Sequence, residues 1–215
     1  MRHGSQGEVE RFPEGREPDP SFRALLGELA WRRLSPAVRQ RFAVKPAPGS
    51  AILYRGTMRE VRASWAGKLL AQLCRLIGTP LAPYGGRDVP VSVRLRLDAE
   101  GNGTVWERSY HFAHRAPVTC RSVKRAEPSG LVEIVGTGIR MALALAECQG
   151  ALHFRSTGYF WRWRRWRLTL PRWLTPGEMH VVHADLGGGR FRFAMAVTHP
   201  LFGEMIRQDG VFVEE

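Results

Sequence analysis

The stretch VPVSVRLRLDAEGNGTVWERSYHF, residues 89–112, determines the expected fold class. From Val89 to Asp98, apolar and polar residues alternate, a period of two that is typical of a strand with one buried face. The short segment 99–103 contains two glycines and an asparagine and predicts a turn. Residues 104–112 then return as the second strand of a hairpin.

The same rhythm continues towards the C-terminus. Further alternating segments lie at residues 139–146, 151–157, 179–186, 190–198 and 203–213, and turns such as Gly187–Gly189 separate several of them. No helical stretch long enough for a crossover lies between them, which favours an antiparallel meander over a parallel α/β sheet. Because an open meander leaves two unpaired edges, we expect it to form a barrel-like or strongly coiled sheet.

Helical spacing is confined to the first third of the chain. Apolar residues recur with a period near 3.6 over residues 22–29, 34–42 and 58–76, which predicts about three N-terminal helices. The last helix is the longest, with Trp65, Leu69 and Leu73 on its apolar side, and we expect it to pack on one end of the sheet. The predicted fold class is therefore α+β, mainly β. Residues 1–19 predict a disordered tail, and residues 20–215 a single β-rich domain.

Composition and charge narrow the classes of function. The chain has 215 residues, with 32 Lys and Arg against 20 Asp and Glu, a formal net charge of +12. This surplus favours anionic partners such as lipid headgroups, phosphorylated small molecules or nucleic acid, although an inert basic surface would have the same composition. No apolar run is long enough for a membrane span or a secretory signal, so we expect a cytoplasmic protein.

Motifs for metal, cofactor or catalytic chemistry are weak. The three cysteines are far apart without a CxxC pair, and the histidine pairs spaced by three residues fall on opposite faces of a strand. Phosphate-binding loops and nucleophile elbows are absent from the sequence. We therefore assign no metal site, no cofactor and no catalytic residue from the sequence.

The strand at 104–112 carries an arginine among aromatic residues. Trp106, Tyr110 and Phe112 share one face with Arg108, and Glu133 lies inside the apolar run 131–135 as a potential partner. If this face points inward, Arg108 either binds the polar end of a ligand or forms a structural ion pair. The candidate ligand-binding residues are Trp106, Arg108, Tyr110, Phe112, Glu133, Phe191 and Phe193. An enzyme that uses a Glu/Arg pair in the barrel remains an alternative.

A second candidate site is the Trp- and Arg-rich segment 161–167. Its composition suits a lipid interface, stacking on nucleic-acid bases or a protein interface, and it equally suits an edge strand whose tryptophans cover the core. The candidate surface-contact residues are Trp161, Arg162, Trp163, Arg164, Arg165, Trp166 and Arg167.

Several strings, taken in order, resemble a known family. These are GRDVPVSVRLRL (86–97), VWERSYHF (105–112), LVEIVGTGIRMALAL (131–145), RLTLPRWLTP (167–176) and GGGRFRFAMAVTHPLFG (187–203). From about residue 22 to 212 the chain resembles the bacterial domain of unknown function 4166 family. The matching positions are Trp106, Arg108, Glu133, Pro171, Pro176, Phe191 and Phe193, whereas Ala194 stands where the family often has an acid.

The resemblance implies a grouping without an activity. Similar domains next to a nucleotide-dependent dehydrogenase-like domain imply a role accessory to a redox enzyme. Together with the residues, this favours a non-catalytic binding module for an apolar or amphipathic small molecule or lipid, whose polar end Arg108 contacts. The alternative is a peripheral contact of segment 161–167 with an anionic membrane surface or, less favoured, with nucleic acid. The sequence leaves the oligomeric state open.

Overall fold

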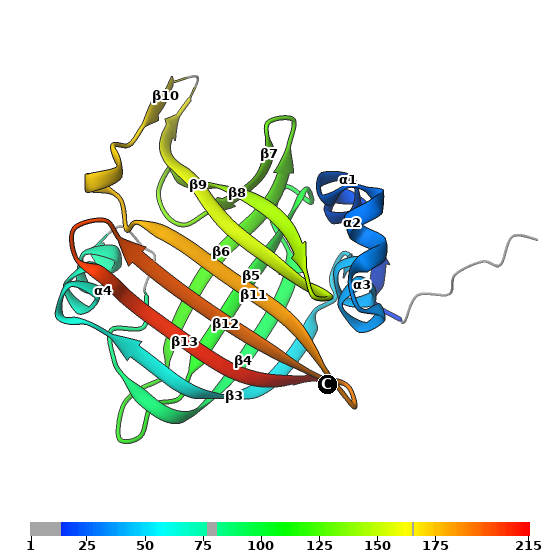
Figure 1. Cartoon of the computed structure of the whole chain (residues 1–215), viewed down its shortest axis with the longest axis horizontal. Coiled ribbons are helices and arrows are strands. Elements are labelled where there is room, and N and C mark those ends of the chain that lie inside the picture. The colour runs from blue at the N-terminus through cyan, green and yellow to red at the C-terminus, as the bar shows by residue number, and fades with distance from the viewer. Residues whose placement is uncertain (1–13, 77–80, 165) are drawn as a thin grey trace, which may run out of the picture.

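The strands form a closed antiparallel barrel, shown in Figure 1. The structure, a computed structural model, describes residues 14–76, 81–164 and 166–215. In spatial order the ten barrel strands are β9 (Ala151–Trp163), β11 (Glu178–Gly187), β12 (Arg190–His199), β13 (Gly203–Glu214), β3 (Ile52–Ala63), β4 (Gly86–Leu97), β5 (Gly103–Tyr110), β6 (Val118–Glu127), β7 (Gly130–Ile134) and β8 (Ile139–Cys148). Strand β8, the last in this order, also pairs with β9, the first, and this pairing closes the ring. The predicted mainly β, barrel-like meander is confirmed.

Two short strands lie outside this ring. Strand β10 (Trp166–Thr169) pairs with the end of β9. Strand β1 (Arg16–Pro18) pairs with β2 (Val44–Pro46) in a separate two-stranded sheet. The predicted disordered tail, 1–19, lies outside the described residues up to residue 13, and its residues 16–18 form β1.

The alternation read from residues 89–112 determines which side chains point into the barrel. In the β4–β5 pair, Val93 lies opposite Arg108 and Leu95 opposite Trp106. Val93, Leu95 and Trp106 are buried, so this face is the interior. Because side chains on a strand alternate between faces, Arg108 points into the barrel as well.

Three short helices cover one end of the barrel, which we call the helix-capped end (Figure 1). They are α1 (Ser21–Leu26), α2 (Glu28–Arg33) and α3 (Pro36–Phe42). Ser35 caps α3 by accepting a hydrogen bond from the Val38 amide, and Pro36 occupies the first turn, as the sequence pattern indicates. Phe22 and Phe42 pack against Phe154 of β9, with ring centroids 6.1 and 5.7 Å from it. This end is therefore filled by aromatic packing.

The fourth helix, α4 (Trp65–Leu76), lies at the opposite end, which we call the α4 end (Figure 1). It packs through small residues: Ala66 and Ala71 are buried, and a Cβ on Gly67 would lie 2.1 Å from the Met205 carbonyl oxygen of β13. Ser64, just before the helix, accepts a hydrogen bond from the Gly67 amide. The close approach of helix and strand requires glycine at this position.

The predicted helix over residues 58–76 starts too early, because residues 58–63 belong to β3. The register of β3 against β13 shifts between Asp209 and Gly210, which leaves Arg59 as an extra residue. A bulge of this kind brings residues three apart to the same face. Met58 and Val61 are consequently both buried, at a spacing that imitates a helix.

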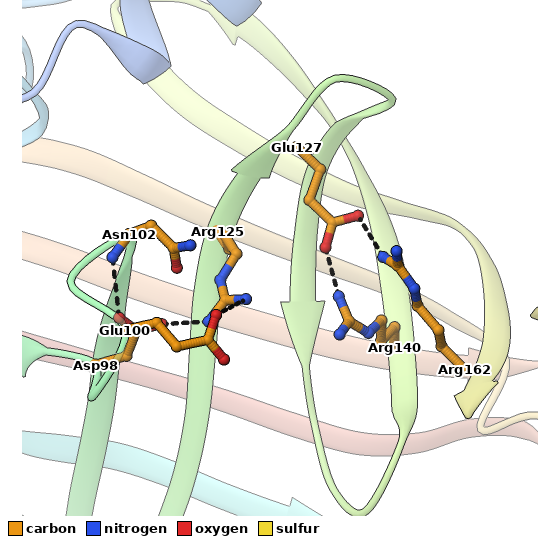
Figure 2. A network of polar contacts seen from close by, with 7 residues as sticks. All are labelled: Asp98, Glu100, Asn102, Arg125, Glu127, Arg140 and Arg162. Carbon is orange, nitrogen blue, oxygen red and sulfur yellow. Dashed lines mark hydrogen bonds and ion pairs between the residues drawn. The ribbon is translucent and has the colours of Figure 1, made fainter. Parts of the chain in front are cut away.

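Charged residues on the outer wall form two groups of ion pairs (Figure 2). Arg125 of β6 binds Asp98 and Glu100 at the β4–β5 turn, with 2.9 Å between its Nη1 and Glu100 Oε2. Glu127 binds Arg140 of β8 and lies 3.4 Å from Nη1 of Arg162 in β9. These ion pairs join neighbouring strands on the outside of the barrel.

Candidate functional site

The barrel contains an interior cavity of about 460 Å³ that lies towards the α4 end. Its walls are mainly apolar and come from the barrel strands, from α4 and from the segment between β10 and β11. Leu73 of α4 and Leu174 line the cavity and yet are 53% and 60% exposed, so they mark its mouth. This volume lies within the roughly 300–1,000 Å³ that small-molecule pockets occupy.

A cluster of charged side chains projects into this apolar space. Lys124 of β6 lies 3.0 Å from Glu133 of β7, measured from Nζ to Oε1. The Ser122 hydroxyl donates a hydrogen bond of 2.6 Å to the same carboxylate oxygen. Register explains the contact, because Lys124 and Glu133 are directly opposite each other on antiparallel strands. Burial raises the pKa of Glu133, but Lys124, Arg108 and Ser122 outweigh it and lower the pKa below its usual value.

Arg108 of β5 lines the same cavity and has no such partner. It forms no ion pair or hydrogen bond with any of the described residues. Its Cζ atom lies 5.7 Å from the ring centroid of Trp106 and 6.0 Å from that of Phe193. Since Glu133 balances Lys124, the guanidinium of Arg108 is a positive charge in excess inside the barrel.

Apart from Arg121, an exposed residue that also lines the cavity, the other polar groups of the cavity are uncharged. His183 of β11 is surrounded by aromatic rings, and burial, reinforced by nearby positive charges, holds its pKa well below its usual value. The hydroxyl of Tyr110 donates a hydrogen bond of 2.8 Å to Oε1 of Gln208, and burial raises its pKa. Burial also raises the pKa of the Cys120 thiol to about 11. At neutral pH these groups leave the excess charge of Arg108 unchanged.

The structure brings together four of the seven predicted ligand-binding residues, since Arg108, Tyr110, Glu133 and Phe193 line the cavity. Trp106 lines a second, smaller cavity of about 70 Å³ near the helix-capped end. Phe112 packs on Tyr84 and Tyr110, with ring centroids 5.6 and 6.1 Å away. Phe191 packs on Tyr54 and Phe212, with ring centroids 5.3 and 5.6 Å away. Neither Phe112 nor Phe191 lines either cavity.

The expected pair of Arg108 with Glu133 is not formed. Glu133 is engaged by Lys124 and Ser122, two residues that the sequence interpretation missed. Both lie on β6, whose inward positions Cys120, Ser122 and Lys124 give no apolar alternation. The sequence signal for Ser122 and Lys124 is limited to their place on a strand that neighbours the apolar run containing Glu133.

The segment 161–167 is the tip of the β9–β10 hairpin, with a turn at Arg164. Figure 1 shows this hairpin projecting beyond the barrel wall. Trp161 and Trp166 are exposed, and Cζ of Arg167 lies 4.0 Å from the Phe160 ring centroid. The structure does not describe Arg165 or the side chain of Trp163. The described side chains of this segment do not line the interior cavity.

Two further features are absent from the described residues: a membrane-spanning helix and a cluster of metal ligands. Over 14–76, 81–164 and 166–215, no helix is long and apolar enough to cross a bilayer. Within the same ranges, no group of three or more His, Cys, Asp or Glu residues is placed to hold a metal ion.

Comparison with known proteins gives the family. No curated protein matches the chain. The model of the family described as "Domain of unknown function (DUF4166)" matches residues 34–212, which include the barrel strands except the last two residues of β13, and the whole charged cluster. A match over most of the chain establishes membership, so this protein belongs to the DUF4166 family.

Proposed function

We propose that this protein binds an amphipathic small molecule or lipid that carries one anionic group. The apolar part lies in the interior cavity, and the anionic group pairs with Arg108. The observation that carries the proposal is the guanidinium of Arg108, which lines a cavity of about 460 Å³ without an ionic partner among the described residues.

The energetic argument concerns the cost of an unpaired charge. An ion removed from water is unfavourable unless it is paired or hydrogen-bonded. Lys124 and Glu133 satisfy this requirement together, whereas Arg108 does not. A carboxylate, sulfate or phosphate group can form a bidentate charge-assisted pair with a guanidinium, and the surrounding apolar walls strengthen that pair.

The ligand's apolar part is favoured by the walls of the same cavity. Phe154, Val181, Met195 and Val197 are among the residues that line it. Burial of a hydrocarbon chain contributes about 0.8 kcal/mol per methylene group. Since apolar burial gives affinity and Arg108 adds charge selectivity, the cavity should prefer an anionic amphiphile to a neutral one of equal length.

Calorimetric titration with dodecanoate and with dodecanol tests this preference. Wild-type protein should bind dodecanoate at least about tenfold more tightly, because a charge-assisted hydrogen bond contributes about 1.5–3 kcal/mol. Arg108→Met should abolish the difference. Arg94→Met is the matched control, because Arg94 is exposed on the outer wall of the adjacent strand β4.

Equal binding of both amphiphiles by wild-type protein would contradict the role of Arg108. Failure of both to bind would contradict the cavity as a ligand site. A role accessory to a redox enzyme, a catalytic use of the cavity, contact with nucleic acid and a cytoplasmic location remain predictions from the sequence.

A further inference from the structure

The α4 end exposes large apolar side chains around the mouth of the cavity. On α4 they are Trp65, Leu69 and Leu73, which recur every fourth residue and therefore share one face of the helix. Their exposed fractions are 71%, 55% and 53%. Helix α4 thus buries its small residues, Ala66, Gly67 and Ala71, and exposes these three large ones, whereas Leu70 packs against the barrel.

Contacts connect this face to two further exposed apolar segments. The Trp65 ring lies 5.6 Å from the ring of Phe202 in the β12–β13 turn. Phe202 in turn lies 4.9 Å from the His199 ring, whose Nε2 is 3.4 Å from the carbonyl oxygen of Trp173. Trp173 and its neighbour Leu174 belong to the 3-10 turn before β11 and are exposed. We call the set Trp65, Leu69, Leu73, Trp173, Leu174, Leu201 and Phe202 the apolar rim.

Basic residues lie next to the apolar rim. The segments that carry the rim, 65–76, 171–176 and 199–203, contain three Lys or Arg residues and no Asp or Glu. Lys68 and Arg75 of α4 and Arg172 of the 3-10 turn are exposed beside the rim. Apolar and aromatic side chains flanked by cations match an interface of acyl chains below anionic headgroups.

We propose that the apolar rim docks on an anionic lipid bilayer, so that the cavity mouth faces the membrane. Leu73 and Leu174 belong to both the rim and the cavity wall, so an amphiphile could pass between bilayer and cavity with little exposure of its chain to water. A second copy of the chain is disfavoured as the occupant, because it would place two surfaces with an excess of basic residues against each other. The docking surface itself does not depend on the ligand proposed for Arg108.

Vesicle co-sedimentation tests the docking. The probes are vesicles of phosphatidylcholine alone and of phosphatidylcholine with phosphatidylglycerol. Wild-type protein should bind the anionic vesicles more tightly, and binding should weaken as salt rises. Leu69→Ser should reduce the affinity by about tenfold or more, since it removes an inserted side chain. Leu29→Ser is the matched control, because Leu29 is an exposed leucine of α2 at the helix-capped end.

Arg108→Met separates the two proposals. It should bind vesicles like the wild type while losing its preference for dodecanoate, and Leu69→Ser should keep that preference in solution. No binding to anionic vesicles at low salt, or equal losses in Leu69→Ser and Leu29→Ser, would overturn the docking. Sedimentation of a wild-type dimer that Leu69→Ser dissociates would overturn it too, because a second copy would then cover the rim.

Discussion

The two ends of the barrel use helices in opposite ways. At the helix-capped end, α1–α3 insert large side chains: Phe22, Trp31 and Phe42 are buried. At the α4 end, the helix packs mainly through alanine and glycine, and Trp65, Leu69 and Leu73 are exposed. One end is therefore a packed cap, and the other combines a cavity mouth with an apolar surface.

This difference separates stability from recognition. Apolar groups removed from water stabilise the fold, whereas the same groups left in contact with water contribute little to it. A contiguous exposed apolar surface on a folded protein indicates an interaction site more often than scattered single residues do. We therefore expect substitutions at the helix-capped end to affect folding, and those at the α4 end to affect binding.

Phe42→Ala should have the largest effect. Phe42 is buried and contacts Phe22, Phe154 and His183. Its truncation leaves a cavity in the cap and should lower the free energy of unfolding by about 3–5 kcal/mol, as measured by urea denaturation. A loss below about 1 kcal/mol would show that the cap is not part of the core.

Glu133→Gln should lower stability by about 3 kcal/mol, because it leaves Lys124 buried without a counter-ion. The double variant Glu133→Gln/Lys124→Met should recover most of this loss, since it removes both charges. The measurement is again urea denaturation at neutral pH. If the single and double variants are equally unstable, the ion pair is not the cause.

Gly67→Ala tests how α4 is held. The added Cβ would meet the Met205 carbonyl oxygen, and a backbone atom can move away only if the helix shifts. We expect a loss of about 1–3 kcal/mol, the usual range for overpacking. Gly158→Ala is the matched control, because a Cβ on Gly158 in β9 would meet no atom within 4 Å. An unchanged urea denaturation midpoint for Gly67→Ala would mean that α4 is loosely attached to the barrel.

Acidification should weaken the charged cluster around Glu133. The pKa of Glu133 is lowered in the folded state, so its contribution to stability is present above its ordinary pKa of 4.5. This contribution is lost as pH falls through the lower, folded value. Below about pH 4 the wild type should therefore lose more stability than the Glu133→Gln/Lys124→Met variant, in thermal unfolding followed by circular dichroism. If the stability of the two proteins falls equally with pH, Glu133 is not the source of the difference.

Leu69→Ser should have the smallest effect on folding. Leu69 is exposed, so the free energy of unfolding should change by less than about 0.5 kcal/mol. Thermal unfolding of this variant beside Phe42→Ala compares the two ends directly. A large destabilisation would show that Leu69 packs against the fold, and the two ends of the barrel would then not differ in this respect.

The sequence predicts the barrel better than it predicts the surroundings of Arg108. Hairpins with a clean period of two, such as β4–β5 and β11–β12, follow from alternation because one face is buried. The same alternation places Arg108 inside. Its neighbours could not be predicted, since Lys124 reaches Glu133 only through the register of β6 against β7.

Helix α4 shows a second limit of pattern reading. Periodicity groups Trp65, Leu69 and Leu73 on one face, but it does not state whether that face is covered. Here the opposite, small-residue face is the one that packs, because Gly67 permits the closest approach to β13. Similarly, the bulge at Arg59 extended the helical pattern into a strand.

The position of β13 has a consequence for the order of assembly. This strand lies between β12 and β3, so its pairing with β3 joins residues 206–214 to residues 54–63. During synthesis, no earlier strand can supply that contact, and the long loop must close before the ring is complete. The interior cavity is therefore complete only once β13 has paired with β3. Until then, the growing polypeptide has two open sheet edges and an incompletely formed apolar interior. Protection by chaperones would matter most in this state.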